Sequence, residues 1–361
     1  MNCEVNRDKK KVIFFGCALD PDERDESIRE KLSCMNRGRT DYDPYLQVMR
    51  IIETEVDAEQ FEAIGSLEVP SWLCPLPASD EKAYINVDNF VAFIDGDECR
   101  TFARMISEHV IDEILPRISC MIAVDHSLTG GVFEKIAAYY GPEAVSLIVL
   151  DSHTDAVPVS LLAGAIAYDM ETNPSSPYDP SDPFLHGRVD TFNASSFLYH
   201  LLDEGAVIPE NLYILGVSDY PVKRSFRIKD DRIRRYVGVY AELKKRGVRI
   251  LTKKDLLSGS ARIRAALRSI RTPYVYVSID MDIGAGNALD GVRFRNWKGM
   301  NEKQIYRIAG HIGELLNDGV RLAGMDLTEF NPRRADVSQD RTYRIGANLI
   351  RRLCFGLDEI P

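Results

Sequence analysis

Histidine and aspartate residues stand directly after three apolar runs of the chain, where predicted strands end. Two of these groups place their polar residues at alternate positions, so an extended backbone points them to one side. The third is the Asp-His-Ser sequence at 125–127, which a Gly-Gly pair follows closely. These groups supply six candidate metal ligands: His126, Asp151, His153, Asp155, Asp280 and Asp282.

The composition of this ligand set indicates the chemistry. Four carboxylates balance the charge of two divalent cations, and two imidazoles complete a shell of oxygen and nitrogen without thiolate. This set suits Mn²⁺ best, with Zn²⁺, Co²⁺, Fe²⁺ and Ni²⁺ as competitors. Each motif alone is more often a turn, a helix cap or a surface residue. Together they predict a two-metal site, which activates water for hydrolysis.

The elements that must position these residues alternate along the chain. Apolar runs typical of strands buried on both faces occupy residues 11–16, 119–124, 146–150, 212–216, 249–251, 274–279 and 322–326. Helical spacing of apolar residues occupies 101–116, 129–140, 193–204, 222–246, 254–270, 302–316 and 338–357. This alternation predicts a three-layer α/β/α fold with a mainly parallel central sheet. In such a sheet, ligands bind beyond the carboxyl ends of the strands.

Two regions do not follow the alternation. Residues 35–95 are ambiguous, and residues 156–185 hold several prolines with Ser, Asp and Asn, which predicts a long active-site loop. No repeat or Gly/Ser linker divides the chain. We therefore expect a single α/β domain over residues 1–361.

Charge and hydropathy exclude several classes of function. The formal charge of -10 argues against nucleic-acid binding and favours a cationic substrate. No apolar run is long enough to span a membrane, and the N-terminus lacks the pattern of a secretory signal, so we expect a cytoplasmic protein. The seven cysteines are scattered without a Cys-x-x-Cys pair, which argues against disulfides or a thiolate zinc site.

The motifs, taken in order, resemble those of the ureohydrolase family, which includes arginase, agmatinase and formimidoylglutamase. Asp-His-Ser, Asp-Ser-His-Thr-Asp, Asp-Met-Asp and Met-Asp-Leu-Thr-Glu-Phe-Asn-Pro follow one another in the family's order. The resemblance covers roughly residues 119–357 and implies an arginase/deacetylase-like fold.

The resemblance also implies roles for single residues. It makes Asp151 and Asp280 the carboxylates that bridge two metals. His126 and Asp155 then belong to one metal, and His153 and Asp282 to the other. Glu329 corresponds to the glutamate that pairs with the substrate guanidinium. His186 matches a histidine that transfers protons or positions substrate, and Asp155 is the expected proton acceptor.

The substrate is less determined than the reaction, because the sequence departs from the family around the site. The segment between Asp155 and His186 is longer than in typical arginases and lacks a recognisable site for an α-carboxylate. It offers acids for a distal ammonium group instead: Asp169, Glu171, Asp179 and Asp182. Arg188 instead favours a substrate whose tail ends in a carboxylate. We expect a binuclear hydrolase of a small guanidino compound, agmatinase-like rather than arginase-like, that releases urea and an amine.

Two alternatives stay open. A deacetylase-like amidohydrolase shares the fold, but uses one metal and a paired-histidine motif that this chain lacks. A metal-binding homologue without catalytic activity is the second alternative. The resemblance further implies a homo-oligomer, a trimer or a hexamer.

Overall fold

A single sheet of eight parallel strands forms the centre of the protein. The computed structural model describes residues 11–35, 43–176, 178–182, 185, 187–286, 289–335 and 340–357. Within these, the strands stand in the order β2-β1-β3-β8-β7-β4-β5-β6, and every neighbouring pair is parallel. Their bounds are β1 Val12–Cys17, β2 Phe61–Leu67, β3 Ile118–Ala123, β4 Val145–Leu150, β5 Leu212–Val217, β6 Arg249–Thr252, β7 Tyr274–Asp280 and β8 Arg321–Thr328.

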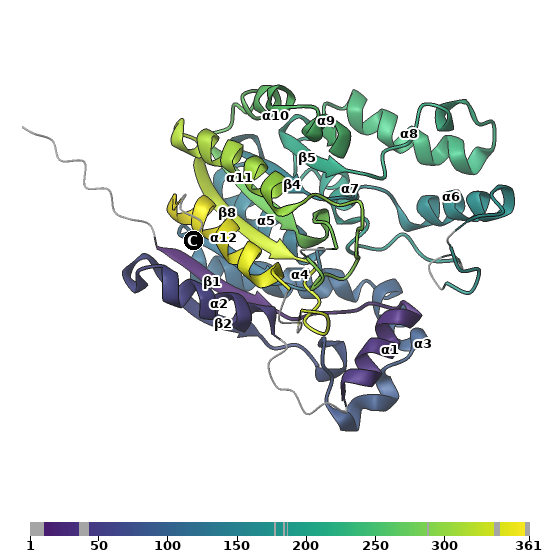
Figure 1. Ribbon diagram of the computed structural model, residues 1–361, viewed down its shortest axis with the longest axis horizontal. Helices are drawn as coiled ribbons and strands as arrows, with labels where there is room; N and C mark the ends of the chain where they lie inside the picture. The colour runs from purple at the N-terminus through teal and green to yellow at the C-terminus, as the bar shows by residue number, and fades with distance from the viewer. Residues whose placement is uncertain are drawn as a thin grey trace, which may run out of the picture.

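Helices cover both faces of this sheet and complete three layers (Figure 1). One face packs against α2 (Pro44–Glu55), α9 (Lys253–Leu257), α10 (Ser260–Leu267), α11 (Glu302–Asn317) and α12 (Thr342–Phe355). The other face packs against α1 (Asp25–Cys34), α3 (Val87–Asp95), α4 (Glu98–His109), α5 (Leu128–Tyr140), α7 (Phe197–Asp203) and α8 (Asp231–Lys245). Alternate residues of the inner strands enter the two cores, as Ile148 and Val149 of β4 do. The predicted three-layer α/β/α fold is confirmed.

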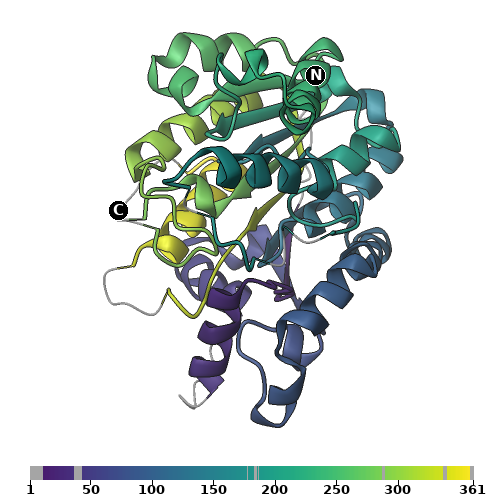
Figure 2. The same ribbon diagram turned by 90° about the vertical axis from the view of Figure 1, so that its right-hand side faces the viewer.

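The strand order brings distant parts of the chain together. β8 and β7 are inserted between β3 and β4, so four adjacent central strands come from residues 118–150 and 274–328. Because the strands are parallel, all four end at the same edge. The arrowheads of β1 and β8 point to the right in Figure 1, toward the side that Figure 2 shows face-on. On that side α6 crosses the middle, with α8 above it and α1 below.

The prediction of a loop over residues 156–185 is wrong in part. Residues Val159–Thr172 form α6, a helix of 14 residues that packs against α8. Its Leu- and Ala-rich sequence has good helix propensity. The prolines that suggested a loop lie at its borders: Pro158 is the N-cap, and Pro174 follows its end. They therefore delimit the helix without interrupting it.

The ambiguous region 35–95 contains regular structure where the structure describes it. It provides α2, α3 and the edge strand β2, which pairs with β1 alone. The sequence pattern does not predict β2, because its sequence, FEAIGSL, carries polar residues. Its side chains are only half-buried or exposed. The predicted helix 222–246 is shorter than expected and begins at Asp231, after Asp230 accepts a capping hydrogen bond. The predicted helix 254–270 divides at Gly259, whose φ is +130°.

Across the described residues, no helix combines the length and apolarity needed to cross a membrane.

Candidate metal centre

His126 lies one turn beyond the end of β3 and is fully buried. Its backbone N–H donates to Glu329 Oε1 at 3.2 Å. Its imidazole Nε2 lies 3.0 Å from Ser278 Oγ, and that hydroxyl donates to Asp326 Oδ1 at 2.7 Å. Since the hydroxyl proton is directed to Asp326, Nε2 carries the proton that it donates to Ser278. Nδ1, on the other side of the ring, faces Asp155 Oδ2 at 2.9 Å, so this nitrogen and that carboxylate are placed to share a cation.

Beyond β4 and β7, the ligands are arranged by turns. Asp151 Oδ1 accepts the backbone N–H of His153 at 2.7 Å, and Asp280 Oδ1 accepts that of Asp282 at the same distance. Each aspartate thereby folds the next two residues back on itself, as Asx turns do. The expectation that extended backbone aligns these residues is wrong: β4 ends at Leu150 and β7 at Asp280.

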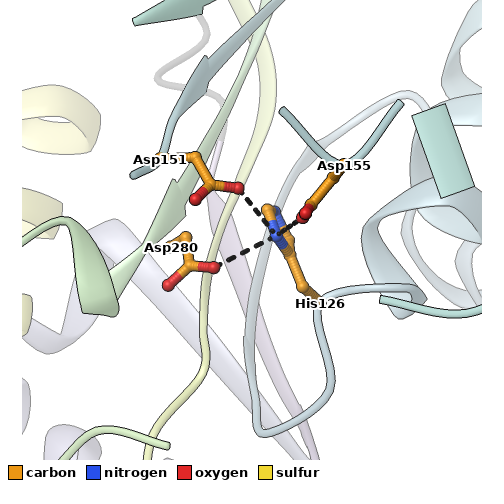
Figure 3. A group of neighbouring side chains, drawn as sticks. All are labelled: His126, Asp151, Asp155 and Asp280. Atoms are coloured by element: carbon orange, nitrogen blue, oxygen red, sulfur yellow. Dashed lines mark hydrogen bonds and ion pairs between the residues drawn. The ribbon is translucent and has the colours of Figure 1, made fainter. Parts of the chain in front are cut away.

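The six predicted ligands come together as two overlapping groups. One contains His126, Asp151, Asp155 and Asp280, whose side chains converge in Figure 3 from the segments that follow β3 and β4 and from the end of β7. The other combines the same Asp151 and Asp280 with His153 and Asp282. In each group, ligand atoms from all four residues lie within 4.8 Å of one another. The shared carboxylates are the two that the resemblance assigned as bridges.

The carboxylates of this cluster repel one another, and either protons or a cation must compensate that repulsion. His126 Nδ1 lies 2.9 Å from Asp155 Oδ2, 3.3 Å from Asp280 Oδ2 and 3.5 Å from Asp151 Oδ2. Burial and the neighbouring carboxylates raise the pKa of Asp155 and Asp280 well above the usual range. Burial opposes a charged His126, but Asp155 and Asp280 outweigh it and raise the pKa of His126.

The donor set fits divalent metal ions. Among the described residues, Asp151 Oδ2 and Asp282 Oδ2 are buried without a hydrogen bond, and only the imidazoles of His126 and His153 approach them as ion pairs, at 3.5 and 3.3 Å. Buried carboxylate oxygens without partners are costly unless a cation compensates them. The cluster is therefore compatible with metal binding through carboxylate oxygens and imidazole nitrogens.

Two residues of the site have backbone conformations that are rare outside glycine. Asp155 has a φ of +46° and Glu329 a φ of +62°. Such conformations persist where the surroundings fix them, and they concentrate at functional sites. Asp155 O accepts the N–H of Leu198 at 2.9 Å, and Glu329 N donates to Val124 O at 2.9 Å. Both residues are thus anchored through the backbone.

Glu329 is buried beside the cluster, and an arginine accompanies it. Arg293 Nη1 lies 2.9 Å from Glu329 Oε1 and 3.0 Å from Asp125 Oδ2. Burial raises the pKa of Glu329 to about 7, although Arg293 opposes the shift. The sequence analysis missed Arg293, because the stretch 291–299 carries no recognisable motif.

A cavity of about 540 Å³ opens onto the cluster and is lined by residues from both halves of the chain. Its α6 wall is apolar and includes Leu162 and Ile166. Beside this wall, Asp219 accepts hydrogen bonds from Thr154 Oγ1 at 3.1 Å and Tyr240 OH at 3.2 Å. Burial raises the pKa of Asp219. Asp219 follows the predicted strand 212–216 closely, so its position after a strand could have identified it.

The acids predicted for a distal ammonium group are distributed differently. Asp182 lines the cavity. Glu171 pairs instead with Arg232 on the surface at 2.7 Å, and Asp179 accepts from Ser181. Asp169 accepts a hydrogen bond from Asn173 at 3.3 Å, within the last turn of α6 and its C-cap.

The two predictions for the 186–188 stretch have different outcomes. Arg188 lines the cavity, but its guanidinium pairs with Glu23 and Asp95, each at 2.7 Å. Glu23 and Asp95 therefore take up Nη1 and Nε of the guanidinium that was expected to hold a carboxylate tail. His186 lies outside the described residues.

The fold and the site define an α/β protein with a candidate metal centre at the carboxyl edge of its sheet. A model described as "Arginase family" matches residues 16–356. The chain therefore belongs to the arginase family, and the predicted resemblance is confirmed. A search among curated proteins found no match.

Solved structures of three family members share this fold. Arginase from Bacillus caldovelox has a TM-score of 0.58 at 16% identity, over 97% of this chain and 100% of its own. Formimidoylglutamase from Bacillus subtilis subsp. subtilis str. 168 has a TM-score of 0.60 at 14% identity, over 97% and 88%. The agmatine ureohydrolase of Thermoplasma volcanium has a TM-score of 0.52 at 16% identity, over 97% and 91%. At these identities the likeness establishes the fold.

Proposed function

We propose that this protein is a binuclear metal-dependent hydrolase that cleaves a guanidino compound into urea and an amine. The observation that carries the proposal is the pair of overlapping four-residue groups that share Asp151 and Asp280. Two groups with two common carboxylates are what a pair of neighbouring cations requires. Glu329, buried beside them, supplies a carboxylate for a cationic head group.

The proposed metal assignment follows the composition of the two groups. His126 and Asp155 would hold one ion, His153 and Asp282 would hold the other, and Asp151 and Asp280 would contribute to both. Mn²⁺ is the proposed metal, because the donors are oxygen and nitrogen without sulfur. When bound, the two ions supply an activated water and withdraw electrons from the guanidino carbon.

The chain's own residues orient the substrate and transfer protons. Glu329 Oε2 is buried and accepts an N–H of the head group, which directs the guanidino carbon toward the carboxylate cluster. Hydrolysis replaces one C–N bond by a C–O bond from water, and the departing amine gains a proton. Asp155 takes the proton from water and returns it, and His186 is proposed to assist this transfer.

The lining of the cavity supports an amine tail on the substrate. Asp219 Oδ1 is buried and receives no hydrogen bond from the residues described here. Tyr236 and Tyr240 stand beside it, and tyrosine faces attract ammonium groups. The apolar α6 wall accommodates a methylene chain. We therefore propose an agmatinase-like substrate, a guanidino group joined to an ammonium group by a short alkyl chain.

Urea release from a panel of guanidino compounds tests the proposal. The panel contains agmatine, an aminopropyl derivative of agmatine, arginine, guanidinobutyrate, guanidinopropionate and guanidine, each assayed with Mn²⁺, and in parallel with Ni²⁺. We expect the highest kcat/KM for a compound with an ammonium tail, and no activity for Asp280→Asn. A protein that holds two metal ions per chain but releases urea from none of these compounds would contradict the proposal. One tightly bound ion per chain would favour a deacetylase-like reaction instead.

Assembly and location are parts of the same proposal. We propose a homo-oligomer, a trimer or a hexamer, in the cytoplasm. Mass measurement in solution tests the assembly, and a molecular mass of one chain at micromolar concentration would contradict it.

A further inference from the structure

Arg293 places a guanidinium of the chain itself against the carboxylate that is proposed to bind the substrate. Its side chain is 6% exposed, and the residue lines the cavity. Its Nη1 contacts Glu329 Oε1 at 2.9 Å, and its backbone N–H donates to Glu329 O at 3.0 Å. Side chain and main chain therefore both bind the same glutamate.

The two oxygens of Glu329 are in unequal environments. Oε1 accepts Arg293 Nη1 and also the backbone N–H of His126 at 3.2 Å. Two donors use the two lone pairs of that oxygen. Oε2 is buried, and no donor in the described part of the chain reaches it. Only Oε2 is available to a ligand.

The surroundings of Arg293 hold it in this position. Asp125 Oδ2 accepts from the same Nη1 at 3.0 Å, and Asp20 Oδ1 and Asp22 Oδ2 lie 3.6 and 3.9 Å from Nε. The carbonyl of Arg293 accepts from Arg334 Nη1 at 3.1 Å. Moving the guanidinium away would leave several buried carboxylates without compensation, which is costly. A ligand must therefore share Glu329 with Arg293.

We propose that Arg293 sets the head-group specificity by restricting Glu329 to a single acceptor oxygen. This inference rests on the proposed function. A free carboxylate binds a guanidinium through two parallel N–H···O contacts, whereas here the head group contacts one oxygen. A formimidoyl group, which has one terminal nitrogen where a guanidino group has two, then loses little binding. The site accepts both head groups on the same tail.

A matched pair of substrates measures this effect. Agmatine releases urea, and N-formimidoylputrescine, with the same aminobutyl tail, releases formamide when water replaces its C–N bond. A second charge-assisted contact would be worth about tenfold or more. Because neither head group makes a second contact with Glu329, we expect the two kcat/KM values of the unaltered protein to agree within about tenfold. A guanidino preference of several hundredfold would overturn the proposal.

Substitution of Arg293 provides the second measurement. In Arg293→Lys the positive charge remains, which preserves the fold, but the side chain ends one bond short of Nη1 and releases Oε1. We expect the guanidino-to-formimidoyl ratio to rise about tenfold or more. Arg344→Lys is the control, because it is the same substitution at an arginine whose side chain pairs with Glu55 of α2, away from Glu329. A ratio that is unchanged in Arg293→Lys, or that rises equally in both variants, would overturn the proposal.

A ligand-bound structure separates this inference from the proposed function. Crystals of the Mn²⁺-loaded protein soaked in guanidinium chloride should show guanidinium on Oε2 with Arg293 still on Oε1. Guanidinium that displaces Arg293 and spans both oxygens, or that is absent from Glu329, overturns the inference. If neither compound is hydrolysed, the proposed function fails, and the structure still decides the role of Arg293.

Discussion

Two aspartates at the site each fix the position of a second ligand through a short backbone hydrogen bond. Asp151 accepts the N–H of His153, and Asp280 accepts the N–H of Asp282, both at 2.7 Å. Each of these aspartates uses one oxygen for the turn and directs the other toward the cluster. The shared carboxylates thereby position ligands as well as supply them. Loss of Asp151 or Asp280 should therefore lower the metal content more than loss of a ligand that belongs to only one of the two groups.

Metal content of single variants tests this ranking. We expect Asp282→Asn to keep one ion per chain, because the group around His126 remains complete. Asp280→Asn should keep neither at micromolar metal, since it removes a carboxylate common to both groups and weakens the turn that holds Asp282. Elemental analysis after dialysis measures both. Asp231→Asn, at an exposed position of α8, serves as control and should keep both ions. Equal metal content in the first two variants would contradict the ranking.

At the scale of elements, the position of helix α5 depends on two glycines near its start, Gly130 and Gly131. A Cβ on Gly131 would lie 2.0 Å from the carbonyl oxygen of Ala103 in α4, and one on Gly130 would lie 2.7 Å from Phe192. These two residues are the Gly-Gly pair that follows the Asp-His-Ser sequence. The structure shows that they allow close contact with α4 and with an aromatic ring. This packing fixes the start of α5, two residues after His126.

Gly131→Ala should therefore destabilise the protein by about 1–3 kcal/mol, since overpacking forces two helices apart. Gly238→Ala is the matched control, because a Cβ there meets nothing within 4 Å and α8 gains helix propensity. We expect the control to be neutral or stabilising by up to about 1 kcal/mol. Urea denaturation of the metal-free proteins compares the two. Equal stability would show that α4 moves without cost.

At the scale of the whole molecule, the proposed metal ions would join segments that are far apart in the sequence, from His126 to Asp282. The ligands lie at or just beyond the ends of β3, β4 and β7, and only the folded sheet, in the order β3-β8-β7-β4, brings these ends together. The unfolded chain does not hold these six side chains together. Binding to the native state alone adds stability according to ligand concentration.

Removing metal with a chelator should consequently lower the Tm. At a free metal concentration of about 100 times Kd, each ion contributes about 2.7 kcal/mol, and for a chain of this length we expect a decrease of about 3–8 °C for two ions. Differential scanning calorimetry before and after chelation measures the decrease, and readdition of Mn²⁺ should restore the Tm. Asp280→Asn is the control, and its Tm should not respond. An identical decrease in that variant would show that the chelator acts elsewhere.

The amino-acid sequence by itself was sufficient for the fold class and for the set of clustered residues. Buried parallel strands are nearly continuous apolar runs, and the residues that follow them stand out by contrast. This is why seven of the strands and His126, Asp151 and Asp280 could be recognised from local pattern. β2 could not, because an edge strand is buried less and its sequence carries little periodicity.

The tertiary structure alone decided which residues meet across the sheet. Arg293 and Glu329 are 36 residues apart, and Asp219 lies 65 residues from Thr154. No local periodicity encodes such a contact, because it depends on the order in which strands assemble and on the paths of the loops between them. The residues that cluster at the strand ends are therefore predictable from local pattern, while the lining of the cavity depends on long-range contacts.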